Sequence, residues 1–274
     1  MRALWLVLAL CVSLFSAPPD KDLASRYANE GIAAYNGGDY AAALEKFTRS
    51  IDADPSFADA YYNRGNARYA LGDQNQSIAD YSRALKLNPK YALAYANRGA
   101  VYANLGDHKR AILDYDQAIK LDANLTLAYY NRAEAHRILN DPQSAIADYG
   151  RTIKLDANYA KAYVMRGATN AYLGEYAKAI SDYDLAIKLD ANDAMIYYYR
   201  GISRHYLNDL KSAIADYSRS IALNPNYAYA YANRASAYGQ SGDLKNAAAD
   251  AKKACDLGDC KLLEYMKANS LLPK

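Results

Sequence analysis

The sequence predicts an all-α solenoid built from seven helical hairpins of 34 residues each, and three observations predict it. The block Tyr61–Gly65 returns 34 residues later as Tyr95–Gly99 and again as Tyr129–Ala133. Each unit also carries a Gly or Asn at one fixed place, followed at once by an acidic residue. The units end in Asp-Pro, Asn-Pro or Asp-Ala. Self-similarity at a period of about 20 to 50 residues is typical of a repeat solenoid.

The first half of each unit is predicted to be a helix with a Tyr and, four residues later, a small residue. A small side chain at one fixed place lets a second helix approach closely, which explains Gly inside a helix despite its cost of about 1 kcal/mol relative to Ala. The Tyr column is Tyr27, Tyr61, Tyr95, Tyr129, Tyr163, Tyr197 and Tyr231, and the small column is Gly31, Gly65, Gly99, Ala133, Gly167, Gly201 and Ala235.

A tight turn and a second helix are predicted to follow. Gly and Asn accept the left-handed backbone conformation that ends many helices, and Asp is a strong N-cap for the next one. An aromatic residue such as Phe47 or Tyr81 then falls four residues after a small one, which places an apolar stripe on one helical face. The turn column is Gly38, Gly72, Gly106, Asn140, Gly174, Asn208 and Gly242.

With this period and this small–aromatic–small pattern, residues 24–261 resemble the tetratricopeptide repeat family. The resemblance implies a right-handed superhelical solenoid whose concave face binds a protein or peptide. The expected repeats are 24–57, 58–91, 92–125, 126–159, 160–193, 194–227 and 228–261. Residues 262–274 are expected to form a capping helix and a tail, because Leu262, Leu263 and Met266 fall on one helical face.

Residues 1–17 are expected to be a secretory signal peptide, because one positive charge precedes an apolar run, Ala3–Phe15, and small residues follow it. The run is too short to span a bilayer, which takes about 20 apolar residues. A non-cleaved anchor or a buried first helix is the alternative. After removal of the signal we expect a periplasmic or secreted protein with no membrane span.

Export would place Cys255 and Cys260 in a compartment where disulfides form. The two flank Gly258, a predicted helix terminator, so the chain could fold back and join them. The alternative is that Cys255 is a small core residue, since its column holds Ile or Leu in the other repeats.

Two charged columns stand sixteen residues apart, Arg in the first helix and Asp in the second, as in Arg98 and Asp114. In the first 34-residue repeat the signs of the charges are exchanged, with Glu30 in the Arg column and Lys46 in the Asp column. The exchange predicts an ion pair between the two helices of each hairpin; two independent solvated charges are the alternative. We assign these residues to architecture.

The residue before each Arg is predicted to line the concave groove. It is Asn in the first four units, as Asn29, Asn63, Asn97 and Asn131, and the ladder fails at Met165 and Tyr199. A carboxamide both donates and accepts hydrogen bonds, which suits the backbone of an extended peptide. The resemblance supports this prediction, since an asparagine ladder in this slot holds peptide backbone in the O-linked N-acetylglucosamine transferases. We expect Tyr35, Tyr62, Tyr69 and Tyr130 to face the groove as well.

Other functions have less support in the sequence. The formal charge is +3 with 33 basic and 30 acidic residues interspersed, so we expect no nucleic-acid partner. His108, His136 and His205 occupy unrelated columns, and we expect no metal, no cofactor and no catalytic residues. The sequence thus predicts a non-enzymatic binding scaffold for a protein or peptide. A Tyr-lined module for cell-wall glycans is the alternative.

Overall fold

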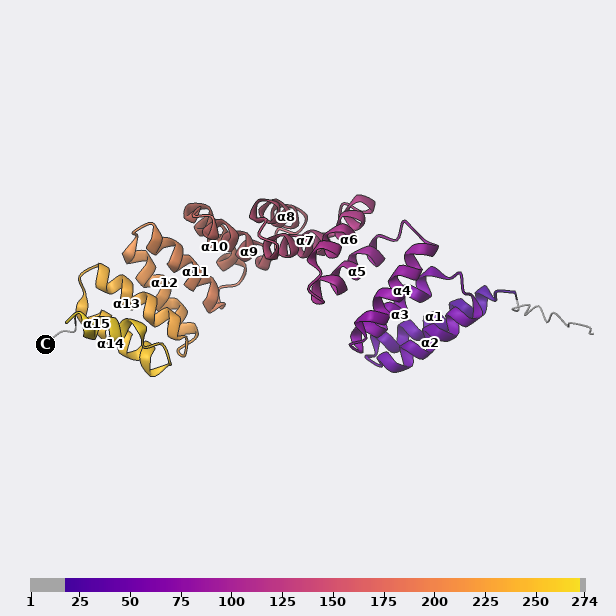
Figure 1. The fold of residues 1–274 in the computed structure, drawn as a ribbon, viewed down its shortest axis with the longest axis horizontal. Helices are drawn as coiled ribbons and strands as arrows, with labels where there is room; N and C mark the ends of the chain where they lie inside the picture. The colour runs from indigo at the N-terminus through magenta and orange to yellow at the C-terminus, as the bar shows by residue number, and fades with distance from the viewer. Residues whose placement is uncertain (1–17, 272–274) are drawn as a thin grey trace, which may run out of the picture. The chain divides into compact units, whose positions relative to one another are not determined.

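The structure, a computed structural model, describes residues 18–271 of the chain (Figure 1). The predicted signal segment, residues 1–17, lies outside this part. The described residues form fifteen α-helices and no strand, which confirms the predicted all-α class. The chain divides into two compact units at Val101, within α5 (Ala92–Asn104).

The first unit contains two complete hairpins and the start of α5. In each hairpin the two helices pack on one another, and α2 also packs on α3. The helices are α1 (Lys21–Asn36), α2 (Tyr40–Ala53), α3 (Ala58–Ala70) and α4 (Gln74–Leu87).

The second unit continues the same plan, with α7 on α8, α9 on α10, α11 on α12 and α13 on α14. Its helices after α5 are α6 (His108–Leu121), α7 (Thr126–Ile138), α8 (Pro142–Leu155), α9 (Ala160–Tyr172), α10 (Tyr176–Leu189), α11 (Ala194–Tyr206), α12 (Leu210–Leu223), α13 (Ala228–Gln240), α14 (Leu244–Asp256) and α15 (Lys261–Ala268).

The turn inside each hairpin follows the predicted chemistry. All seven turn residues have positive φ, from 61° at Asn140 and Asn208 to 88° at Gly242. The next residue caps the second helix: the Asp39 carboxylate, for example, accepts a hydrogen bond from the Ala42 N–H at 2.9 Å. Glu175 is the exception and makes no side-chain cap, because its chain is one methylene longer than the Asp found elsewhere.

Close approach of the two helices explains the Gly column. A Cβ added to Gly65 would meet the Tyr81 ring at 2.8 Å, and one added to Gly201 would meet Tyr217 at 2.7 Å. The rings of Tyr81, Tyr149 and Tyr217 are almost completely buried and form the centre of each hairpin.

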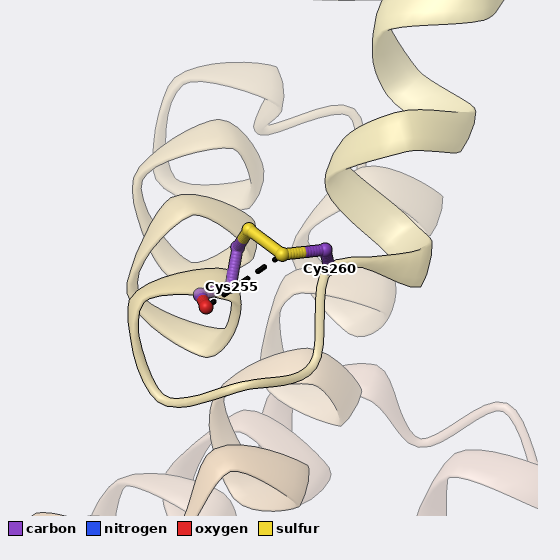
Figure 2. The surroundings of a disulfide bond; sticks show 2 residues. All are labelled: Cys255 and Cys260. Atoms are coloured by element: carbon purple, nitrogen blue, oxygen red, sulfur yellow. Dashed lines mark hydrogen bonds between the residues drawn. A yellow bond between two sulfur atoms is a disulfide. The ribbon is translucent and has the colours of Figure 1, made fainter.

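The capping helix is present as α15. Met266 is 4% exposed and packs against Ala235, Ala247 and Ala251 of the last hairpin, which lacks the usual aromatic residue. Just before α15, Cys255 and Cys260 are joined in a disulfide (Figure 2), with their Cα atoms 3.9 Å apart. Gly258 between them has φ 103°, so the chain reverses there as the sequence indicated.

Candidate functional site

The predicted ion pair joins the two helices of six of the seven hairpins, as Arg–Asp in five of them and as Lys–Glu in the first. The Arg64 guanidinium contacts Asp80 at 2.7 Å, and Arg132 contacts Asp148 at the same distance. Lys46 and Glu30, the exchanged pair, lie 2.6 Å apart. The carboxylates of Asp80 and Asp148 are buried, so independent solvated charges do not describe them. The pairing prediction is confirmed for these hairpins and for Arg166–Asp182, Arg200–Asp216 and Arg234–Asp250.

The same arginines also join successive hairpins, which the sequence analysis did not predict. Arg132 reaches the Asp116 carboxylate of the preceding hairpin at 2.5 Å, and Arg200 reaches Asp184 at 2.6 Å. Burial lowers the pKa of Arg132, but hydrogen bonds to Asp148 and Asp116 outweigh it and leave that pKa above its ordinary value. Arg132 and Arg200 therefore cross-link successive hairpins.

The residue before each Arg is the predicted Asn ladder, and its rungs are not equivalent. Asn29 is exposed, and Asn63 and Asn131 are half-buried. Within residues 18–271 these three side chains form no hydrogen bond. Asn97 differs, because its Nδ2 donates to the Tyr62 hydroxyl and to Asn66 Oδ1, both at 3.0 Å. Three rungs are thus available to a ligand, and one is part of the fold.

Two of the predicted groove tyrosines are packing residues. Tyr130 is only 7% exposed, and its ring packs on Tyr149 and Tyr159 with centroids 5.8 and 5.1 Å away. Tyr62 is half-buried and packs in the same way on Tyr81 and Tyr91. The expectation that Tyr130 presents its ring to the groove is wrong, because a Tyr in the next hairpin covers it.

The cause is an alternation that the sequence analysis missed. The Tyr62 column reads Tyr, Ala, Tyr, Val, Tyr, Ala over the second to seventh repeats: Tyr62, Ala96, Tyr130, Val164, Tyr198 and Ala232. Each of its tyrosines packs on a Tyr 29 residues later, and the third such pair, Tyr198–Tyr227, has ring centroids 4.8 Å apart. A period of 68 residues therefore lies over the period of 34.

The other two predicted groove tyrosines line a cavity in the first unit. This cavity, of about 270 Å³, lies among α1, α3, α4 and α5 and is called the repeat 2 cavity below. Its lining residues are Tyr35, Asn66, Tyr69, Tyr81, Asn97, Ala100 and Val101. Tyr35 is half-buried and Tyr69 is 40% exposed.

The polar groups of the repeat 2 cavity satisfy one another. The Tyr81 hydroxyl donates to Asn66 Oδ1 at 2.6 Å, and Asn97 Nδ2 donates to the same oxygen. Burial raises the pKa of Tyr81, so its hydroxyl is a donor throughout the physiological range. Asn66 was not among the predicted site residues, yet its amide oxygen is the centre of this network.

The remaining expectations to compare with the described residues concern a metal site and a membrane span. No group of three or more His, Cys, Asp or Glu side chains between residues 18 and 271 could hold a metal ion. No helix in this part of the chain is long and apolar enough to cross a membrane.

The chain matches models of the tetratricopeptide repeat along most of its length. A TPR repeat model matches residues 31–72, 65–106 and 203–242, and two Tetratricopeptide repeat models match 92–125 and, separately, 127–159, 160–193 and 228–257. The chain therefore belongs to the tetratricopeptide repeat family, whose arrays are in general scaffolds that bind proteins or peptides. No curated protein matches it.

Solved structures share the fold. The TPR protein YrrB, described as having an unusual peptide-binding site, is 24% identical, with a TM-score of 0.64 over 68% of this chain and 96% of its own. The C-terminal part of a TPR protein from Cytophaga hutchinsonii is 19% identical, with a TM-score of 0.74 over 86% and 98%. A MamA structure is 25% identical, with a TM-score of 0.58 over 60% and 96%. These similarities show that the chain shares its fold with these proteins.

Proposed function

We propose that this protein is a non-catalytic scaffold of the cell envelope or secreted space that binds an extended peptide segment of a partner protein. The observation that carries the proposal is the unpaired carboxamides on the first helices, which are Asn29 and Asn63 in the first compact unit and, taken separately, Asn131 in the second. A carboxamide offers a hydrogen-bond donor and an acceptor, which match the C=O and N–H of a peptide group. It can therefore bind peptide backbone independently of the side chains of the peptide. Specificity then depends on the neighbouring residues.

The partly buried position of Asn63 and Asn131 supports this use. A half-buried carboxamide has lost part of its hydration, so a ligand amide that pairs with it replaces fewer water contacts than at an open surface. The neighbouring column has Ala28 and Ala96 in the first and third repeats, where the second, fourth and sixth repeats have Tyr. Where Tyr62 stands in that column, the next rung, Asn97, bonds to it; where Ala stands, the next rung is unpaired.

The test is capture of partners from a bacterial envelope extract by the wild-type chain and by Asn63→Ala/Asn131→Ala. We expect the double variant to lose the wild-type partners while keeping its helical content. Asn75→Ala/Asn124→Ala is the matched control, because both of those side chains are exposed and lie outside the ladder. Identical partner sets for wild type and the ladder variant would exclude the ladder.

Export is part of the proposal and has its own test. In a bacterial host we expect the full chain to fractionate with the periplasm, and a chain lacking residues 1–17 to stay in the cytoplasm. Equal distribution of the two would remove the envelope from the proposal while leaving peptide binding intact.

The glycan alternative has a weaker basis, because Tyr62 and Tyr130 pack on Tyr91 and Tyr159 and have little ring surface left. Exposed rings do occur in the second unit, at Tyr172 and Tyr206, which are 70% and 68% exposed. Binding to purified peptidoglycan that is lost in Tyr172→Ala/Tyr206→Ala, and kept in the ladder variant, would favour glycan over peptide.

A further inference from the structure

A second cavity, in the sixth and seventh repeats, shares five lining columns with the repeat 2 cavity. It has a volume of about 560 Å³, lies among α11, α12 and α13, and is called the repeat 6 cavity. Its lining includes Ile202, His205, Tyr206, Tyr217, Asn233 and Ser236. Tyr217 and Asn233 stand 136 residues after Tyr81 and Asn97, which is four repeats. The same two polar groups therefore recur at the same place.

The hydroxyl of Tyr217 differs from those of Tyr81 and Tyr149, its counterparts in the second and fourth repeats. It is buried and has no hydrogen-bond partner among residues 18–271, whereas Tyr81 donates to Asn66 and Tyr149 donates to Glu134. Burial, with smaller contributions from Tyr198 and Asp216, raises the pKa of Tyr217, so the group stays protonated and remains a donor. Buried polar groups in folded proteins almost always have a partner, so an exception points to a group that is supplied from outside.

One substitution explains the missing partner. Ile202 occupies the column of Asn66 and Glu134, the two residues that accept from the buried Tyr in the second and fourth repeats. An Ile side chain has no acceptor. The sixth repeat therefore retains the Tyr hydroxyl as a hydrogen-bond donor but lacks the side-chain oxygen that accepts from this Tyr in the second and fourth repeats.

A second donor converges on the same place. In the repeat 2 cavity Asn97 Nδ2 donates one N–H to Tyr62 and the other to Asn66 Oδ1. In the repeat 6 cavity Asn233 Nδ2 donates to the Tyr198 hydroxyl at 2.9 Å, and its other N–H has no acceptor within the described residues. The repeat 2 cavity therefore shows what fits: an amide oxygen that accepts from a Tyr hydroxyl and an Asn amide at once.

The lining also restricts the charge of the ligand. Apart from His205, the residues that line the repeat 6 cavity carry no ionisable group that is charged near neutral pH. The nearby guanidinium of Arg204 pairs with Asp216 at 2.8 Å. A neutral amide is therefore favoured over a carboxylate, which would need a free cation.

We propose that the repeat 6 cavity binds a main-chain carbonyl oxygen of a peptide, held by the Tyr217 hydroxyl and the free N–H of Asn233 in place of the missing Asn66 oxygen. The inference rests on the proposed scaffold function and extends it. It places a peptide contact in the sixth and seventh repeats, where Asn233 returns to the column of the Asn ladder after Met165 and Tyr199.

The test titrates the full chain, with its tyrosines selectively ¹³C-labelled, with acetyl-(Gly-Ser)4-amide, a neutral peptide without a charged or large side chain. We expect the Tyr217 ring signal to shift saturably in NMR spectra. Tyr217→Phe should weaken binding about tenfold, the loss of one buried hydrogen bond. Ile202→Asn should abolish the response at this site, because it restores the internal acceptor of the second repeat. Tyr81→Phe is the matched control and should leave the binding constant at the repeat 6 cavity unchanged.

Several outcomes would overturn the inference. If the Tyr217 chemical shift does not change up to the solubility limit of the peptide, the hydroxyl forms hydrogen bonds with solvent and does not bind the peptide. Equal affinity of wild type and Ile202→Asn would mean that the peptide binds elsewhere. A stronger shift with free glutamine or acetate than with the blocked peptide would assign the site to a side-chain amide or a carboxylate.

This test is independent of the ladder test. Loss of captured partners in Asn63→Ala/Asn131→Ala together with an unmoved Tyr217 signal would refute this inference and keep the proposed function. A Tyr217 response with unchanged partner sets would refute the ladder and keep this site.

Discussion

The repeat 2 cavity and the repeat 6 cavity have the same construction and opposite hydrogen-bonding states. In both, a Tyr buried under a Gly of the facing helix lies beside an Asn that donates to a Tyr of the preceding hairpin. In the second repeat an amide oxygen from Asn66 completes the network. In the sixth repeat Ile202 takes its place, and the Tyr217 hydroxyl has no hydrogen-bond partner in the described part of the chain. A single column thus separates a closed structural network from a candidate receptor for an amide.

The difference teaches how a repeat protein can gain a site without changing its scaffold. Each repeat contacts only its neighbours, so one position can vary while the columns that hold the hairpins together are kept. Asp80 and Asp216 each bind two arginines, one of them the conserved column residue, and this frame is the same around both cavities. Three pairs of variants test the comparison, taken from the largest expected effect to the smallest.

The first tests what the two cavities share. Arg64→Ala and Arg200→Ala each remove one arginine from a buried carboxylate, at Asp80 and Asp216, and each should lower the free energy of unfolding by about 3 kcal/mol. Urea unfolding followed by circular dichroism measures both. Arg83→Ala is the control, because this half-buried arginine makes no ion pair with any residue that the structure describes. A loss under about 1 kcal/mol at either site would contradict a common frame.

The second converts one cavity into the other. Asn66→Ile removes the acceptor of both Tyr81 and Asn97, so two donors lose their partner and stability should fall by about 2 kcal/mol. Ile202→Asn makes the reverse change and should raise the free energy of unfolding by about 1 kcal/mol, since Tyr217 gains an acceptor. If both changes destabilise the chain alike, the two cavities are not equivalent.

The third compares the two buried hydroxyls directly. Tyr81→Phe deletes a hydroxyl that is hydrogen-bonded and should lower the free energy of unfolding by about 1 kcal/mol. Tyr217→Phe deletes one that has no partner in the free protein and should leave stability unchanged or slightly raise it. Equal losses, measured by thermal and urea unfolding, would show that Tyr217 has an acceptor after all.

Much of this could be predicted from the sequence because it is local. The turn residues were identified by their tolerance of positive φ, as at Gly38 and Asn140, and the caps by the Asp that follows. The Arg–Asp pairing was predicted from the sign exchange at Glu30 and Lys46, since two sites that change together are in contact. Each of these inferences needs only one repeat and its copies.

The candidate site was predicted less well. Asn97 and Asn131 occupy the same column, but only the structure shows that Asn97 bonds to Tyr62 and Asn66, which belong to the preceding repeat. Tyr130 was predicted to face a ligand, and it is covered by Tyr159 of the next hairpin. The signal that could have shown this is the alternation of Tyr and Ala at every second repeat, visible in the sequence once a period of 68 residues is sought.

By itself the sequence determined the hairpin, its turn, its caps, its ion pair and the number of times they recur, because these depend on backbone preference and on contacts within 34 residues. Only the tertiary structure decided which identical side chains are satisfied by the protein and which are left for a ligand. Hydrogen bonding of Asn97, Asn131 or Tyr217 depends on the residue that a neighbouring helix brings to it. The columns that recur in nearly every repeat, such as the Arg and Asp of the ion pair, define the scaffold. A position where a repeated donor has lost its acceptor, such as Tyr217, is the better candidate for function.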